Sequence, residues 1–157
     1  YVLLHMALQN RGEGILLIAC GLFLFWVFIL RKETGGLYVP VELTHNGRKL
    51  SVTALRDTGN SLHDPITGKP VLIVDAVVAE GLTGLTRNQL GRPVETIGSI
   101  PGLRLIPYKT VGGSGLLLAM RLQNVKIGSW CGSSLVAFSP EIFNIEGMYQ
   151  ALTGGVA

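Results

Sequence analysis

The sequence has few cysteines and few charged side chains, and both shortages limit what the protein can be. Only 2 of its 157 residues are cysteines, Cys20 in an apolar run and Cys131 far from it. No metal-binding spacing results, and a disulfide between them is not expected, which fits a reducing compartment. Charged residues make up 15% of the chain, and no basic run exceeds Arg31-Lys32. Nucleic-acid surfaces need clustered basic residues, so we predict no nucleic-acid partner.

Common cofactor motifs and internal repeats are also missing. The glycine-rich stretch over residues 111–115 lacks the Gly-Lys-Ser/Thr ending of a phosphate-binding loop, and no other cofactor signature is visible. The sequence therefore predicts neither a cofactor nor a metal ion. No internal repeat is visible in the sequence. The first residue is Tyr1 rather than Met, so we expect the chain to be a piece of a longer protein.

A long apolar run is present near the N-terminus. Residues 15–30 read ILLIACGLFLFWVFIL, without charge or proline. With its flanks this run approaches the roughly 20 residues that a helix needs to cross a bilayer, so we expect a transmembrane helix over residues 13–32. Trp26 suits one membrane interface. The alternative is a buried core helix, but the apolar surface on every side argues against it.

The residues on either side of this run predict its orientation. Residues 1–12 are expected to be the end of a preceding membrane helix and a turn, with His5 as a packing residue. Arg31-Lys32 follow the span and by the positive-inside rule place the downstream residues in the cytoplasm, although Arg11 reduces the bias. We expect a multi-pass protein of the cell membrane, with a cytoplasmic domain over residues 33–150 and a tail over 151–157.

The expected cytoplasmic domain begins with a β-hairpin. After a short glycine linker, residues 37–43 alternate between apolar and other side chains, and Pro40 favours an edge position. Asn46-Gly47 is typical of a tight hairpin turn. The return strand over residues 49–55 alternates again and leads directly to Asp57.

Asp57, Thr58 and Gly59, followed by Asn60, are residue types that suit the catalytic loop of an aspartic peptidase. The carboxyl group can exchange a proton with water, the hydroxyl can hold the loop, and the glycine allows a tight turn. The same triplet also occurs in ordinary turns, which is the alternative interpretation. Only one such triplet occurs. If it is catalytic, one chain holds half an active site and a second copy supplies the other half.

Two further loops could contribute to a site. In the polar loop over residues 61–70, His63 and Asp64 lie near Asp57 in sequence, but Asp-Pro is a common turn start, so we favour loop structure over a second catalytic pair or a metal site. The glycine-rich residues Val111, Gly112, Gly113 and Ser114 join two expected strands. They are either a plain turn or, beside a catalytic Asp57, the tip of a flap that closes over substrate.

The remaining pattern predicts a mainly β domain with little helix. Residues 82–100 read as a mobile surface excursion. A helix is expected from Asp75 to Glu80, and a C-terminal helix from the Ser139-Pro140-Glu141 start to about residue 146. Further strands are expected over residues 71–74, 103–110, 116–122, 125–128 and 134–138.

This order of elements resembles one lobe of a retropepsin-type aspartic peptidase and, more closely, the sporulation sigma-E factor processing peptidases of endospore-forming bacteria. The matching stretches cover the expected cytoplasmic domain, and the anchor matches in position only. They are residues 57–65 (DTGNSLHDP), 67–71 (TGKPV), 106–112 (IPYKTVG) and 137–140 (AFSP). Asn60 stands where most retropepsins have Ala or Ser. Val136-Ala137 stand where an apolar pair and a glycine would pack under the catalytic loop.

The resemblance implies a retropepsin-like single-lobe domain behind a transmembrane helix, with Asp57 as the catalytic residue and Thr58, Gly59 and Asn60 as support. It also implies a homodimer, a sigma factor precursor as the protein substrate, and an activating signal protein from across the membrane. Two rivals stay open. One is a retropepsin-like peptidase with another substrate. The other is a non-catalytic, membrane-tethered β-rich sensor or interaction domain.

Overall fold

The structure, a computed structural model, describes residues 20–23, 36–110 and 112–154, which fall in two compact units, Tyr1–Gly36 and Leu37–Ala157. In the first unit, residues 20–23 are helical. Most of the expected membrane helix, the turn before it and the Arg31-Lys32 pair lie outside the described residues. Within the described part, no helix is both long and apolar enough to cross a membrane.

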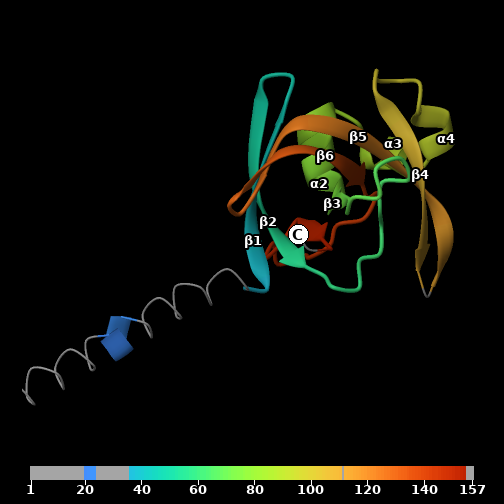
Figure 1. Cartoon of the computed structure of the whole chain (residues 1–157). Coiled ribbons are helices and arrows are strands. Elements are labelled where there is room, and N and C mark those ends of the chain that lie inside the picture. Colours follow the sequence, from blue (N-terminus) through green and yellow to red (C-terminus); the bar gives the residue numbers. More distant parts are fainter. Residues whose placement is uncertain (1–19, 24–35, 111, 155–157) are drawn as a thin grey trace, which may run out of the picture. The chain divides into compact units, whose positions relative to one another are not determined.

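The second unit begins with the predicted hairpin, formed by β1 (Tyr38–His45) and β2 (Arg48–Arg56) (Figure 1). Asn46 and Gly47 connect the strands with φ angles of 48° and 76°. Two positive φ angles are what the tightest hairpin turn requires, and Asn-Gly supplies them at little cost. The alternation of the first strand is confirmed, because Val39, Val41 and Leu43 are all buried.

Within the described residues the strands form one seven-stranded sheet in the order β1-β2-β7-β3-β6-β5-β4, and β1 also pairs with β5. The first six strands of this order therefore close into a ring, and β4 is added at its outside. β5 pairs with three strands, and its register with β6 shifts between Leu122 and Val125. Its first half pairs with β4 and its last residues pair with β1. The remaining strands are β3 (Leu72–Val74), β4 (Leu103–Thr110), β5 (Gly113–Ile127), β6 (Trp130–Phe138) and β7 (Ala151–Thr153).

Two details of the predicted strands differ from this sheet. The expected edge position of Pro40 is wrong, since β1 has a neighbour on both sides from Val41 to Thr44. Pro40 itself lies just before that double pairing, and its carbonyl accepts a hydrogen bond from the Gly128 N–H at 2.9 Å. The strand expected over residues 125–128 is the continuation of β5 rather than a separate element.

The C-terminal segment departs most from prediction. The helix expected after Ser139 is wrong: the chain forms a loop to residue 150. Side chains take the backbone donors there, since Ser139 Oγ accepts from the Glu141 N–H and Asn144 Oδ1 from the Glu146 N–H. Residues 151–153, expected as part of a tail, form β7 inside the ring, parallel to β2 and antiparallel to β3.

Three helices lie between β3 and β4: α2 (Ala76–Thr83), α3 (Arg87–Leu90) and α4 (Pro93–Thr96). The predicted cap Asp75 is confirmed, because its Oδ1 accepts from the Val78 N–H at 3.0 Å. The mobile excursion expected over residues 82–100 is wrong. Leu85 and Leu90 are 3% and 1% exposed and pack into the main core, so two apolar side chains hold this segment in place.

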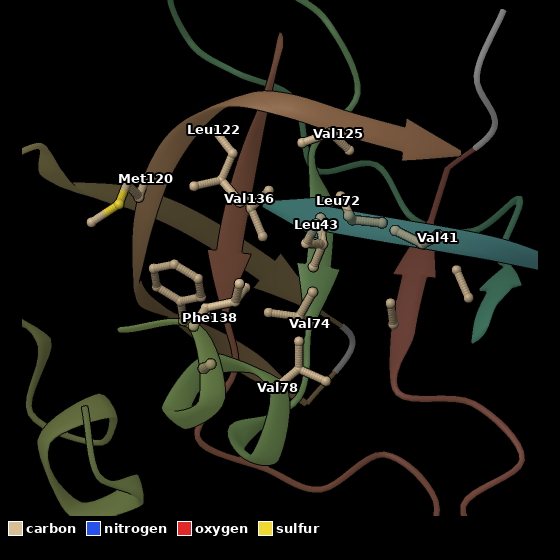
Figure 2. Packing of buried hydrophobic residues seen from close by; sticks show 14 of the residues in the cluster. Val41, Leu43, Leu72, Val74, Val78, Met120, Leu122, Val125, Val136 and Phe138 are labelled. Atoms are coloured by element: carbon tan, nitrogen blue, oxygen red, sulfur yellow. The ribbon is translucent and has the colours of Figure 1, made fainter. Parts of the chain in front are cut away.

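Two hydrophobic clusters organise the unit. The larger lies between the sheet and α2, and Figure 2 shows Phe138 of β6 and Val74 of β3 close to Val78 of that helix. The smaller cluster contains Ile106, Leu117 and Ala137 among others, and Leu62, Ile73 and Tyr108 pack against it. Because Leu62 follows Asp57 closely and Tyr108 lies on β4, this smaller cluster holds the Asp57 loop beside the β4–β5 hairpin.

Candidate active site

Asp57 lies where β2 ends, and the backbone fixes it on both sides. Its N–H donates to the carbonyl of Thr153 in β7 at 2.9 Å, and its own carbonyl accepts from the Asn60 N–H at 3.1 Å. Its side chain is half-buried, and Oδ1 accepts the Gly59 N–H at 2.9 Å. The carboxylate thus has one oxygen held by the loop, while the other is available to solvent or to a ligand.

The neighbours of Asp57 behave as loop residues. Thr58 and Gly59 are exposed. A Cβ at Gly59 would lie 3.2 Å from Asp57 Oδ1, so the smallness of glycine gives the carboxylate its room. Asn60 Oδ1 accepts the Leu62 N–H at 3.0 Å, which stiffens the next turn of the loop. A Cβ at Gly154 would meet the Asn60 carbonyl oxygen at 2.8 Å, so β7 approaches this loop closely.

An open cleft of about 480 Å³ lies beside Asp57. One wall is the loop that contains Asp57 and continues to His63. The opposite wall is the arm of β4 that includes Tyr108 and Lys109, and Figure 1 shows the β4–β5 hairpin standing beside the loop after β2. Ile73, Leu117 and Leu152 are among its apolar lining residues. Asp57 is the sole carboxylate among the described residues that line the cleft.

The expected flap residues lie at the tip of this hairpin, where β4 ends at Thr110 and β5 starts at Gly113. Gly112, Gly113 and Ser114 are exposed, and Val111 lies outside the described residues. Thr110 Oγ1 donates to the Gly113 carbonyl at 3.2 Å across the tip. Gly112, Gly113 and Ser114, the described residues of the tip, do not line the cleft, whereas the arm that leads to them does.

Val136 and Ala137 are completely buried and belong to different clusters. Ala137 pairs in register with Ile73, which lines the cleft. Residue 137 therefore lies on β6 directly beside a strand that lines the cleft, and its packing under the Asp57 loop stays a prediction.

His63 and Asp64 do not act together. His63 is exposed and lines the cleft, whereas Asp64 is 2% exposed and faces away from the cleft. Asp64 accepts hydrogen bonds from the Ile66 N–H and the Thr67 hydroxyl, and pairs with Arg121 of β5. The described residues contain no cluster of side chains suited to a metal ion. Asp64 therefore holds the turn that the Asp-Pro pair predicts, through the Ile66 N–H and the Thr67 hydroxyl.

The environment of Asp64 favours its charged form. Burial by itself acts to raise the pKa of this carboxyl, but the Ile66 N–H, the Thr67 hydroxyl and the Arg121 guanidinium together outweigh burial and lower the pKa. Sequence reasoning missed Arg121, and a single cation in the apolar run of β5 was the available signal. It also missed Tyr108, Lys109 and Gly154, whose positions depend on how distant strands meet.

The carboxylate of Asp57, beside an open cleft, can hold a water molecule and exchange a proton with it, which is general acid–base chemistry. A peptide segment could lie in the cleft between the Asp57 loop and the hairpin arm. One carboxylate can supply only one of the two protonation states that peptide hydrolysis by carboxyl groups requires. The site in a single chain is therefore incomplete for that reaction.

Comparison with known proteins adds a family relationship. Residues 13–154 match the family model described as sporulation factor SpoIIGA, a peptidase family. The chain is 33% identical over 137 residues to the sporulation sigma-E factor-processing peptidase of Priestia megaterium, covering 78% of this chain and 45% of that protein. It is 30% identical over 131 residues to the Bacillus subtilis protein of the same name, covering 71% and 42%. The chain thus spans less than half the length of these relatives. No solved structure matches it.

Proposed function

The chain belongs to the sporulation factor SpoIIGA family of peptidases, and we propose that it is an aspartic endopeptidase that works as a homodimer with one Asp57 from each chain. The observation that carries the proposal is the position of Asp57 at the end of β2, with Oδ1 held by the Gly59 N–H and a cleft beside it. This geometry leaves the carboxylate accessible to a water molecule. A purely structural aspartate in a turn needs no such cleft.

The dimer follows from the chemistry. Hydrolysis of a peptide bond by carboxyl groups needs one acid and one base, and two carboxyl groups close together share one proton because both cannot ionise. A twofold axis beside the Asp57 loop would bring two identical carboxyl groups together. Thr58, exposed next to Asp57, is placed to contact the partner loop across such an axis.

The reaction then needs only the pair of Asp57 side chains and a water. The ionised carboxylate takes a proton from the water while the water oxygen attacks the scissile carbonyl carbon. The protonated carboxyl group donates its proton to the carbonyl oxygen. The tetrahedral intermediate collapses when a proton returns to the amide nitrogen, which leaves as the amine. The β4–β5 hairpin would cover the bound segment and limit the access of bulk water.

The names of the relatives support the proposed substrate, and the apolar run near the N-terminus supports the proposed location. Because the Priestia and Bacillus proteins are named sigma-E factor-processing peptidases, the proposed substrate is a sigma factor precursor that loses an N-terminal pro-segment. We place the enzyme in the cell membrane through the apolar run over residues 15–30, with the peptidase domain on the cytoplasmic side and a signal protein acting from across the membrane. Anchoring both protomers to one surface would raise their effective concentration.

The proposal is tested by co-expressing the chain with a sigma-E precursor and following the shortened product by immunoblot. Asp57→Asn removes the acid but keeps an oxygen that can accept the Gly59 N–H, so the fold should persist and cleavage should stop. Glu95→Gln changes an exposed acid outside the cleft and should cleave normally. An Asp57→Asn chain that still produces the shortened sigma factor would favour the sensor or interaction domain instead.

The homodimer has its own test. When wild type and Asp57→Asn chains are co-expressed, mixed dimers contain one carboxyl group and should be inactive. Cleavage should then fall as the square of the wild-type fraction. A linear dependence would show that each chain works alone. Cleavage of an unrelated peptide, but not of the sigma-E precursor, would point to the rival peptidase with another substrate.

A further inference from the structure

A second cavity of about 200 Å³ lies next to the loop that follows Asp57, and it shares no lining residue with the cleft. The loop divides its residues between the two spaces: His63 lines the cleft, whereas Asp64, Thr67 and Lys69 line the cavity. The cavity is a separate space, and its wall includes the ion pair between the buried Asp64 and the partly exposed Arg121. Neither the proposed reaction nor the family relationship gives it a role.

The polar wall of this cavity offers mostly donors. Both oxygens of Asp64 are already used, Oδ1 by the Ile66 N–H and Oδ2 by Thr67 and Arg121. Arg121 is 27% exposed, and among the described residues only its Nη2 atom has an acceptor. Its remaining N–H groups therefore need an acceptor from solvent or from a ligand. Ser133 adds a hydroxyl to the same wall.

The net charge of the cavity lining indicates the sign of the charge that a ligand would carry. Arg121 and Lys69 are positive and Asp64 is negative, because the pKa of Asp64 is lowered. The lining thus has a net charge of one positive unit. A neutral ligand would leave this charge uncompensated, whereas one carboxylate would balance it and could accept from a planar guanidinium with both oxygens.

The rest of the lining is apolar and limits the size of the ligand. Leu72, Ile127, Trp130 and Leu135 form much of the surface. The volume is below the roughly 300–1,000 Å³ of pockets that hold drug-sized molecules. Only a body of a few carbon atoms would fill it, in contact with the indole ring.

We propose that this cavity is a binding site for a small monocarboxylate with a compact apolar body. The carboxylate lies against Arg121 and the body lies among Leu72, Trp130 and Leu135. A ligand in this position adds an anion beside the Asp64–Arg121 pair and stabilises the loop that also forms a wall of the cleft. The ligand is recognised by charge and by size rather than as a peptide.

The experiment uses the full chain in a nonionic detergent with pentanoate as the probe. In a Trp26→Phe background, Trp130 is the remaining tryptophan, and pentanoate does not absorb where indole is excited. Pentanoate should change the Trp130 fluorescence saturably, and pentanamide, which is uncharged, should bind at least tenfold more weakly. An equal response to the two compounds, or no saturable response, would overturn the proposal.

Two variants locate the site. Ser133→Leu places a larger side chain on the cavity wall, leaves the Asp64–Arg121 pair intact, and should abolish pentanoate binding. The double variant Asp64→Asn with Arg121→Gln removes both charges of the pair together and should weaken pentanoate binding at least tenfold, while pentanamide binding stays unchanged. Because the double variant could lose its fold, Ser133→Leu alone decides the outcome in that case. Unchanged pentanoate affinity in Ser133→Leu contradicts the site.

Asp57→Asn separates this cavity from the cleft. It should bind pentanoate with wild-type affinity, because Asp57 lines only the cleft. A loss of pentanoate binding in that variant would place the ligand in the cleft and overturn the proposal. Pentanoate binding is measured without peptidase activity. The proposed ligand site and the proposed aspartic peptidase function can therefore fail independently.

Discussion

The carboxylate of Asp64 pairs with the guanidinium of Arg121 and so fastens the loop after Asp57 to β5, the strand whose first residues form one arm of the hairpin beside the cleft. The two residues are 57 positions apart in the chain. Their pairing adds a polar contact to the smaller apolar cluster that already holds the loop beside the β4–β5 hairpin. Stability and activity should therefore both respond when it is removed.

Asp64→Asn should lower the free energy of unfolding at pH 7 by about 1–3 kcal/mol, because Arg121 loses its ionic partner and a buried acceptor becomes weaker. The folded pKa of Asp64 lies below its ordinary value of 3.8. The stabilisation is therefore complete well above 3.8 and is lost as the pH falls through the lower, folded pKa. Urea titrations between about pH 6 and about pH 3 should show this loss in the wild type and not in Asp64→Asn. Glu95→Gln, at an exposed site, is the control, and an unchanged pH profile in Asp64→Asn would contradict the role of the pair.

The pH dependence of the stability that Asp75 contributes should have the opposite sign to that of Asp64. Burial raises its pKa above 3.8, although the Val78 and Val77 N–H groups act to lower it. The folded state therefore favours the protonated form, and the stability associated with it is present below 3.8 and lost as the pH rises through the folded pKa. Asp75→Asn keeps a capping oxygen without the charge, so near neutral pH its unfolding midpoint should equal or exceed that of the wild type.

Asp75→Ala is the matched comparison, because it removes the cap itself. It should cost about 1 kcal/mol through the lost hydrogen bond to the Val78 N–H. Chemical denaturation of the three proteins at several pH values separates the cap from the charge. A less stable Asn variant at neutral pH would mean that the buried charge stabilises the fold.

Gly154→Ala should lower stability and precursor cleavage, although residue 154 does not line the cleft. The added Cβ would lie 2.8 Å from the Asn60 carbonyl oxygen, so β7 or the Asp57 loop must shift. We expect a cost of about 1–3 kcal/mol and a roughly 10- to 100-fold loss of precursor cleavage, since small displacements of a catalytic group are expensive. Gly98→Ala has no atom within 4 Å of the new Cβ and is the control. Wild-type cleavage by the Gly154 variant would show that the loop position is not critical.

Gly115→Ala tests the hairpin arm. Its Cβ would lie 2.8 Å from Cε1 of Tyr108, a ring that lines the cleft and must swing away. Because the ring is only half-buried, the fold should tolerate this movement while KM for a peptide substrate rises severalfold and kcat changes little. Gly98→Ala, whose new Cβ has no atom within 4 Å and which lies outside the cleft, should keep the wild-type KM. Equal KM values for both variants would exclude Tyr108 from substrate binding.

Local signals predicted the elements that depend on local interactions. The alternation of β1 and β2, the Asn46-Gly47 turn and the cap at Asp75 all appear as expected, because each depends on residues within a few positions of one another. The Ser139-Pro140-Glu141 start also predicted a helix. The side chains of Ser139 and Asn144 instead accept hydrogen bonds from backbone N–H groups two residues further along, and the segment forms a loop. A capping signal shows where a helix could begin and does not guarantee that one follows.

The sequence by itself determined where the acid stands: a period-two strand and a tight turn deliver Asp57 to the end of β2, followed by a glycine that leaves it room. Only the tertiary structure decided what surrounds that acid. β7 has three residues, too few to show a period, and it enters the ring because the ends of β2 and β3 leave backbone groups that need partners. Arg121 meets Asp64 for a related reason: burial of a carboxylate requires a cation and donors, and the closed ring brings them from a distant strand.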